Sequence, residues 1–193
     1  MAYPRKDAPS DWPIDPLLAK RWSQVLFSDR LITEEHIHSL WEAVRWTPSS
    51  SNEQPWRIIY ATWDQPEAFQ QLASLLNSGN AFAKKAYLLA VLAGVTKSAY
   101  TDKNKYAEHD TGAAMQSLLL QAAALGLAAH PMAGFDRQRA LVALPWDEEV
   151  KVLTMVAIGY PGDEKEATDD LLVRHGNSRQ RKQQSEFVKL LKK

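Results

Sequence analysis

The segment 110–127, DTGAAMQSLLLQAAALGL, constrains the fold more than any other part of the sequence. It has the length and composition of a helix, yet apolar residues occur on almost every side of it. A helix of this kind is stable in water only when other elements cover it all round. Gly126 is placed to end it, because glycine is favoured just after a helix C-terminus. The sequence therefore predicts a domain built around a buried central helix.

The other periodic segments predict an α+β domain. Apolar or β-branched runs typical of strands lie at 56–62 and 87–95, and a third strand is expected within 149–162. Helices are expected at 17–29, 33–47, 66–77 and 136–144. Strands and helices alternate irregularly, and this favours a small mixed β-sheet surrounded by helices. A chain of 193 residues, 45% of them hydrophobic, is long enough to bury one such core.

The two ends of the chain differ from the middle. Residues 1–16 contain four prolines, which forbid regular structure and predict an extended N-terminal arm. The stretch from residue 179, RQRKQQSEFVKLLKK, is basic and polar, and we expect it to leave the body of the protein. Residues 17–193 are predicted to form a single domain.

Composition and missing motifs exclude several classes of function. The 23 basic and 23 acidic residues cancel, so overall charge gives no reason to expect nucleic acid as a partner. The chain has no cysteine, which excludes disulfides, thiolate metal sites and a cysteine nucleophile. No phosphate-binding glycine motif or serine nucleophile motif occurs, and the five histidines suggest no metal site. No run approaches the length of a membrane span, and the N-terminus is too polar for a signal peptide, so we expect a cytoplasmic protein.

Four short segments carry an unusual density of hydrogen-bonding or basic groups. They are KRWSQVLF at 20–27, PSSSNEQPWR at 48–57, HPMAGFD at 130–136 and RQRK at 179–182. Taken singly, each has an ordinary explanation: a solvated helix charge, a proline-bounded turn, a helix C-cap with its connection, and a solvated basic tail. Their order and spacing along the chain are what make them informative.

Together these segments resemble the nitroreductase family of FMN-dependent oxidoreductases, from about Arg21 to Val188. The family's opening motif is similar to Arg21-Trp22-Ser23-Gln24-Val25-Leu26-Phe27. Its second motif, Pro-Ser-x-x-Asn-x-Gln-Pro-Trp, is matched by Pro48, Ser49, Asn52, Gln54, Pro55 and Trp56. The resemblance continues through the helix 110–127, a Gly-Phe-Asp turn at 134–136, a Gly-Tyr-Pro strand end at 159–161, and the closing pair Arg179 and Arg181.

The resemblance implies an FMN site shared between two subunits of a homodimer. Arg21, Arg179 and Arg181 would hold the phosphate, with Ser23 adding a hydroxyl. Forked guanidinium donors suit a dianionic phosphate. The rest of the opening motif, Trp22 and Val25 included, would border the cofactor.

The remaining implied contacts concern the flavin ring. Pro48, Ser49, Ser50 and Asn52 would come from the partner subunit and line the ring with small neutral groups that donate or accept hydrogen bonds. The turn Pro131-Met132-Ala133-Gly134 would lie against the ring near its reactive nitrogen, where glycine permits close backbone approach.

No catalytic protein acid or base is implied, since the flavin carries the redox chemistry. NADH or NADPH would reduce FMN, and an electron-poor small molecule such as a nitroaromatic or quinone would then accept the electrons. The predicted homodimer is intimate, with exchanged C-terminal segments. Three alternatives remain open: a specialised enal, semialdehyde or dehalogenating reductase, an FMN-binding protein without turnover, and a helical domain that binds a protein partner through its basic tail.

Two positions depart from the family's pattern. Val25 stands where many members have Arg or Lys, which stabilises the anionic reduced flavin. We therefore expect a flavin that is harder to reduce than in a typical member, unless Lys84, Lys85 or another base substitutes. A redox titration of wild type against Val25→Arg would test this. Ala133 stands where some members have an acidic residue. We expect flavin binding to survive this change, because a backbone N–H can still serve, and the choice of acceptor is left open.

Overall fold

The computed structural model describes residues 6–191. Residues 1–5 of the expected arm and the last two residues of the expected domain lie outside that range. In chain order, with η marking 3-10 helices, the elements are α1 (Pro16–Lys20), α2 (Glu34–Arg45), η1 (Ser50–Asn52), β1 (Trp56–Thr62), α3 (Pro66–Ala73), η2 (Ser78–Lys85), β2 (Leu88–Val95), α4 (Ala107–Ala124), β3 (Ala128–Met132), α5 (Arg137–Ala143), β4 (Val150–Gly159), η3 (Glu164–Glu166), α6 (Asp169–Gly176) and η4 (Gln184–Glu186). The α+β class predicted from the sequence is confirmed.

The four strands form one sheet in the order β1-β2-β4-β3. Every neighbouring pair within residues 6–191 is antiparallel, so the expectation of a mixed sheet is wrong for this part of the chain. The connection between β1 and β2 gives the reason. α3 and η2 return the chain to the end of the sheet where β1 finishes, and Thr62 therefore pairs with Leu88.

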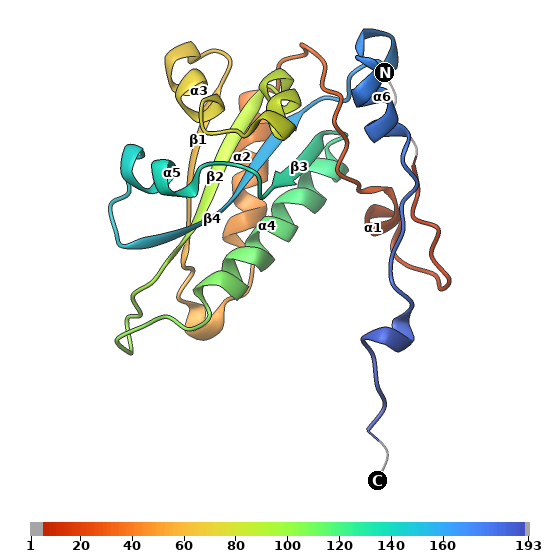
Figure 1. Cartoon of the computed structure of the whole chain (residues 1–193). Helices are drawn as coiled ribbons and strands as arrows, with labels where there is room; N and C mark the ends of the chain where they lie inside the picture. Colours follow the sequence, from red (N-terminus) through yellow and green to blue (C-terminus); the bar gives the residue numbers. More distant parts are fainter. Residues whose placement is uncertain (1–5, 192–193) are drawn as a thin grey trace.

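Two hydrophobic cores lie on opposite faces of the sheet (Figure 1). Along β2, Leu89 and Val91 face the core that includes residues of α3 and α5, whereas Leu88 and Leu92 face the core that includes residues of α2 and α4. Alternate side chains of a strand point to opposite faces, so β2 is buried on both. This confirms the sequence prediction for 87–95.

β3 is an element that the sequence did not predict. A turn was expected for 130–136, but Ala128–Met132 pairs with β4, His130 opposite Ala157. Pro131 lies inside this strand and has no N–H to donate. The strand tolerates proline because it lies at the edge of the sheet, where only one side of the backbone is paired.

Several helix ends differ from expectation. α2 begins as predicted, with the Thr33 hydroxyl accepting the His36 N–H at 3.3 Å. The predicted helix 17–29 is only α1, because the chain is extended from Arg21 onward. The predicted helix 66–77 ends at Ala73. α6 was not predicted.

α4 is the long helix expected from the sequence, and Gly126 follows it with a φ of 74°. The prediction that it would be covered on all sides is wrong for a single chain. Leu118 and Ala122 are buried, but Gly112, Gln116 and Ala124 are exposed along one side. Among residues 6–191, no helix is both long enough and apolar enough to cross a membrane.

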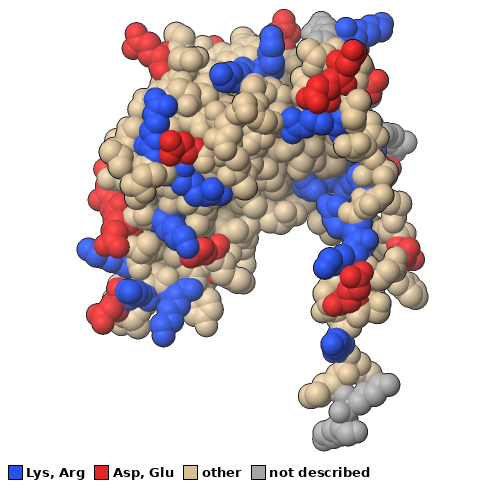
Figure 2. Space-filling model, in the orientation of Figure 1, with Lys and Arg blue, Asp and Glu red and all other residues tan. Residues whose placement is uncertain are grey.

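Residues 6–15 and residues 177–191, at the two ends of the described chain, together form what we call the arm, beside the sheet-and-helix body. Residues 6–15 run next to the segment that follows α6, and the latter continues away from the body (Figure 1). The Ala8 N–H donates to the Ala19 carbonyl at 3.0 Å and ties the N-terminal segment to α1. Figure 2 shows a hollow between the body and the arm, with Lys and Arg side chains gathered along the arm.

Candidate functional site

A cavity of about 640 Å³ lies where the arm meets the body. The three arginines of the predicted phosphate site, Arg21, Arg179 and Arg181, all line it, together with Gln116 of α4. Arg21 directly follows α1, whereas the other two come from the far end of the chain. The fold therefore brings these sequence-distant cations together, as the predicted phosphate site requires.

Arg179 also holds the arm itself in place. Its Nη1 donates to the Lys6 carbonyl at 2.8 Å and to the Ala19 carbonyl, and its Nη2 donates to the Arg21 carbonyl at 3.0 Å. These contacts tie three points of the N-terminal segment to one guanidinium. They fix the backbone that carries Arg21.

The rest of the opening motif lies deeper. Trp22 is buried, with its ring edge-on to His175 at 4.9 Å and the Lys6 ammonium 4.7 Å from its centroid. Val25 is 5% exposed and packs in the core that includes residues of α3 and α5. Ser23 is half-buried between them. Trp22 and Val25 are thus packing residues in a single chain, and Arg21 is the member of the motif that lines the cavity.

Gln24 is a residue of this motif that sequence reasoning missed. It is 0% exposed, and within the described residues its side-chain amide has no hydrogen-bond partner. Its backbone carbonyl accepts a hydrogen bond from His130 Nδ1 at 3.0 Å. An unpartnered buried amide is unusual and often marks a place where a ligand or water belongs.

The segment from Pro131 to Gly134 lies against the N-terminal half of α4. Pro131, Met132 and Ala133 line a cavity of about 350 Å³ with residues of α4, among them Thr111, Gly112 and Met115. Met115 and Leu153 add apolar side chains, and the wall of this cavity is mostly apolar.

Hydrogen bonds from η2 and from the loop before it hold the Gly134 backbone in place. Its carbonyl accepts from Asn80 Nδ2 at 2.9 Å and from the Asn77 N–H at 3.2 Å. A Cβ atom at this position would lie only 2.7 Å from Asn80 Nδ2. The glycine therefore lets the backbone approach η2 closely, and Asn80 is a second residue of this region that sequence reasoning missed.

The loop 48–54 is held in an uncommon backbone conformation. Ser51, Asn52 and Gln54 have φ values of 51°, 54° and 47°. Residues other than glycine rarely adopt this left-handed backbone region. The Ser49 hydroxyl accepts the Gln54 N–H at 3.0 Å, and the Ser50 N–H donates to Asp110 Oδ2 at 2.9 Å. These contacts fix the loop against the start of α4.

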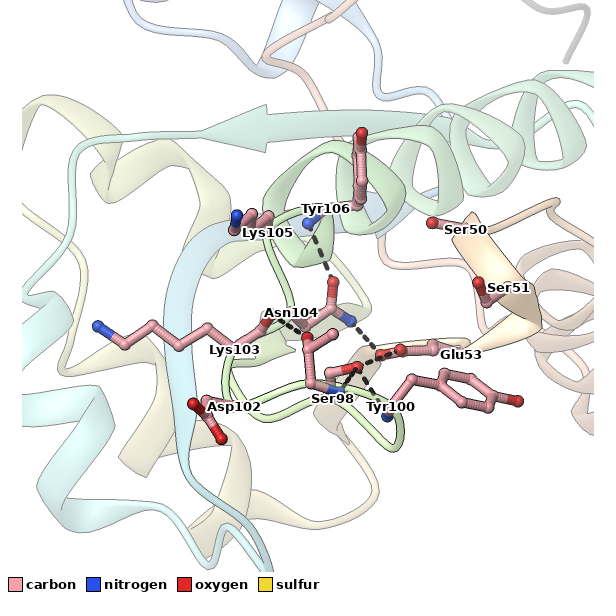
Figure 3. A pocket seen from close by; sticks show the side chains of 11 residues that line it. Ser50, Ser51, Glu53, Ser98, Tyr100, Asp102, Lys103, Asn104, Lys105 and Tyr106 are labelled. Atoms are coloured by element: carbon pink, nitrogen blue, oxygen red, sulfur yellow. Dashed lines mark hydrogen bonds between the residues drawn. The ribbon is translucent and has the colours of Figure 1, made fainter.

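Contacts with the loop 98–106 also support the loop 48–54 (Figure 3). Ser50, Ser51 and Glu53 line a cavity of about 520 Å³ with the loop 98–106. The Glu53 carboxylate accepts from Ser98 Oγ at 2.5 Å and from Asn104 Nδ2 at 2.8 Å. Pro48 and Asn52 line another cavity, at the end of α2. The predicted site residues thus lie in separate places of one chain: the arm cavity, the Pro131 turn and the loop 48–54.

Two histidines border the region: His130 is half-buried and His175 is buried. Burial lowers the pKa of His130, and the charges of Arg174 and Arg21 lower it further, although the bond to the Gln24 carbonyl opposes this. Burial also lowers the pKa of His175, against the effect of Glu164, whose carboxylate lies 3.3 Å from His175 Nε2. Lys6 adds a further lowering at His175.

Comparison with known proteins identifies relatives of this chain. The chain matches the Nitroreductase family over residues 18–160. A protein of Archaeoglobus fulgidus, provisionally named NADH dehydrogenase/NAD(P)H nitroreductase, is 28% identical over 156 residues, 78% of this chain and 86% of that protein. A Mycolicibacterium smegmatis protein, named only as an uncharacterized 15.4 kDa protein, is 37% identical over 116 residues, 60% of this chain and 77% of its own.

Solved structures agree with the sequence match. An oxidoreductase containing FMN superposes with a TM-score of 0.81 at 35% identity, covering 91% of each chain. An FMN complex from Desulfovibrio desulfuricans, provisionally named a nitroreductase, has a TM-score of 0.70 at 23% identity, covers 94% of this chain and 100% of that one, and shows likeness of fold. The family match spans most of the chain. This protein therefore belongs to the nitroreductase family and is an oxidoreductase.

Proposed function

We propose that the protein is an FMN-dependent oxidoreductase in which NADH or NADPH donates electrons and a small electron-poor molecule, such as a nitroaromatic or a quinone, accepts them. Two relatives support the proposal by their names: the Archaeoglobus fulgidus protein by its provisional name, and the solved oxidoreductase by its FMN. The proposal also requires residues of this chain that can bind the phosphate and the ring of FMN.

The observation that carries the proposal is the convergence of Arg21, Arg179 and Arg181 on one cavity. A phosphate dianion is bound best by several charge-assisted hydrogen bonds, each contributing about 1.5–3 kcal/mol. We assign Arg21 and Arg181 to the phosphate, with Ser23 as a hydroxyl donor. Arg179 belongs to the same anchor and also fixes the Arg21 backbone through its carbonyl.

The ring of the cofactor is assigned to the cavity beside Pro131, Met132 and Ala133. Its mostly apolar wall suits a planar aromatic system, and the backbone at Gly134 is held steady by Asn80. The unpartnered Gln24 amide and Trp22 Nε1 supply further polar groups near the phosphate segment. These features fit FMN in both of its parts, the anion and the ring.

We assign the loop residues Pro48, Ser49, Ser50 and Asn52 to the site of the partner subunit in a homodimer. Three features of the chain support a dimer: the exposed side of α4, the hollow beside the arm (Figure 2), and the apolar residues at the end of the arm. Leu190 and Leu191 are 83% and 92% exposed, which is unusual for side chains of this kind. An arm exchanged between subunits would cover all three.

When bound, FMN supplies the redox chemistry between nicotinamide and acceptor, which protein side chains cannot perform. The chain's own residues bind and orient it: the arginines hold the anion, and the Pro131 turn borders the ring. The loop 48–54 offers small neutral donors and acceptors, which line a ring edge without the desolvation cost of a charge. No residue of the chain is assigned as a catalytic acid or base.

The first test is an anaerobic visible spectrum of the purified protein before and after NADPH and then NADH are added. Yellow colour that bleaches supports the proposal, and acceptors such as nitroaromatics, quinones, enals and halogenated aromatics can then be compared for turnover. Yellow colour without bleaching favours an FMN-binding protein without turnover. A colourless protein that does not take up added FMN contradicts the proposal.

The dimer is tested separately by light scattering of the full chain at micromolar concentration. We expect twice the mass of one chain, and a chain shortened after Glu186 is expected to dissociate more readily. A monomeric full chain would contradict both the exchanged arm and the shared site.

A further inference from the structure

One side chain joins the two segments assigned to the cofactor. His130 lies on β3 next to Pro131, and its Nδ1 is 3.0 Å from the carbonyl oxygen of Gln24, in the segment that follows Arg21. A carbonyl oxygen only accepts, so Nδ1 must carry the proton. This hydrogen bond spans 106 positions of the sequence and links the proposed phosphate segment to the proposed ring segment.

The ring of His130 does not point into the cavity beside α4. Side chains of a strand alternate between faces, so His130 shares a face with Ala128 and Met132. Both of these belong to the core that includes residues of α3 and α5, whereas Ala129 belongs to the core on the other face. His130 therefore acts on the proposed site through the backbone of Gln24 rather than by touching the ring.

The imidazole is itself held in position from η2. It packs against Phe82 with centroids 4.9 Å apart, and the guanidinium of Arg174 lies 4.7 Å from the Phe82 centroid. Arg174 Nη1 also donates to the Gly79 carbonyl at 2.9 Å. Because Asn80 of the same segment holds Gly134, η2 supports both ends of the Pro131 turn.

We propose that His130 is a positioning residue that fixes the phosphate-binding segment 21–25 relative to the ring-binding segment 131–134. The inference rests on the proposed FMN site. Its consequence is selectivity: the chain recognises a ligand that has both an aromatic ring and a phosphate at a set separation. FMN has both groups, whereas riboflavin has the ring alone.

The charge around His130 agrees with this role. Arg21 and Arg174 are the charged groups that act on it, and burial with these two cations keeps its pKa below the ordinary value. At neutral pH the ring is thus an uncharged donor, so it orders the Gln24 carbonyl without adding another cation beside Arg21.

The test compares FMN and riboflavin affinities, measured by fluorescence quenching, in matched variants. His130→Phe keeps a ring against Phe82 but removes the donor, and His130→Asn restores a donor close to the Nδ1 position. We expect His130→Phe to reduce the preference for FMN over riboflavin by about three- to tenfold, the effect of one hydrogen bond. His130→Asn should recover part of it, and His38→Phe, at an exposed histidine of α2, should change nothing.

The outcomes separate the inference from the proposed function. An unchanged preference in His130→Phe, with FMN still bound, overturns the positioning role and leaves the FMN site standing. An equal loss of both affinities also overturns it, because that result shows a general packing role. A wild-type protein that binds neither flavin overturns both. If His130→Phe does not fold, as judged by circular dichroism, His130→Asn and His130→Gln decide by the same ratio.

Discussion

The body and the arm of this protein are stabilised in different ways. In the body, strand β2 is buried on both faces, and the sheet and its helices cover one another's apolar side chains. The arm is held mainly by polar contacts such as those of Arg179, and its last described residues expose leucines to water. The two cores of the body are thus buried within one chain, whereas the arm has the character of a segment that packs on another surface.

The largest effect that would test this contrast is expected from Val25→Arg. Val25 lies in the core, so the substitution buries an unpaired charge and should lower the free energy of unfolding by about 3–5 kcal/mol. Leu190→Arg, in the arm, should change it by less than about 0.5 kcal/mol. Urea unfolding of both variants at low protein concentration provides the measurement. Equal effects would show that the arm is as tightly packed as the body.

The same result bears on the flavin potential. Val25→Arg was the natural variant for asking whether a missing cation makes the flavin harder to reduce. Because Val25 is buried, that variant mixes a folding defect with any change of potential. A redox titration of wild type, compared with a family member that has Arg or Lys at this position, is the cleaner measurement. A potential no lower than that member's would contradict the expectation.

A second prediction concerns the cationic junction between arm and body. Arg21→Ala removes a charge-assisted donor from the arm cavity and should weaken FMN binding by about 10- to 100-fold. Circular dichroism should show that the apoprotein still folds, because Arg21 lines the arm cavity and belongs to neither hydrophobic core. Arg139→Ala, at an exposed position of α5, is the matched control. Unchanged FMN affinity in Arg21→Ala would remove this residue from the proposed anchor.

A smaller effect is expected where η2 meets the Pro131 turn. Gly134→Ala places a methyl group 2.7 Å from Asn80 Nδ2, and the flexible amide can move away only by losing its hydrogen bond to the Gly134 carbonyl. We expect a loss of about 1 kcal/mol in the free energy of unfolding. Gly79→Ala, with open space at the Cβ position, serves as the control. If the two variants were equally stable, the close approach at Gly134 would not matter.

The smallest effect is expected from mild acidification. Burial lowers the folded-state pKa of His130 and His175, while an unfolded histidine titrates near 6.5. Below that pH the unfolded chain binds protons at these histidines while the folded chain still keeps them neutral. The stability that the neutral histidines contribute is therefore present above pH 6.5 and is lost as pH falls through the folded-state pKa. Urea midpoints between pH 5 and 8 should show the decline. His175→Asn should make it shallower, and an identical slope would contradict the assignment.

Much of the body was predictable because its pattern is local. The cap at Thr33, the continuous apolar run of β2 and the glycine after α4 each specify an element within a few residues. β3 was missed because its signal is not local: Pro131 disfavours a strand by itself and is tolerated only at the sheet edge. The early end at Lys20 likewise reflects the packing of the extended segment 21–27 into the body, which outweighs helix propensity.

The site residues named from the sequence stay predictions, and the contacts between them were not predicted. The resemblance named Arg21, Arg179 and Arg181, and the fold brings all three to one cavity. Gln24, Asn80 and His130 carried no sequence signal, because their roles depend on a buried amide and on hydrogen bonds to distant carbonyls. The three contacts of Arg179 with the N-terminal segment could not be foreseen for the same reason.

The loop before β1 has a consequence for recognition. Left-handed backbone at Ser51, Asn52 and Gln54 costs on the order of 1 kcal/mol or more at each position, and persists only because surrounding contacts leave no alternative. Such a loop has lost its conformational freedom during folding, so little entropy remains to be lost when a ligand meets it. In the proposed site it would therefore act as a rigid template, to which a molecule of a different outline would have to adjust.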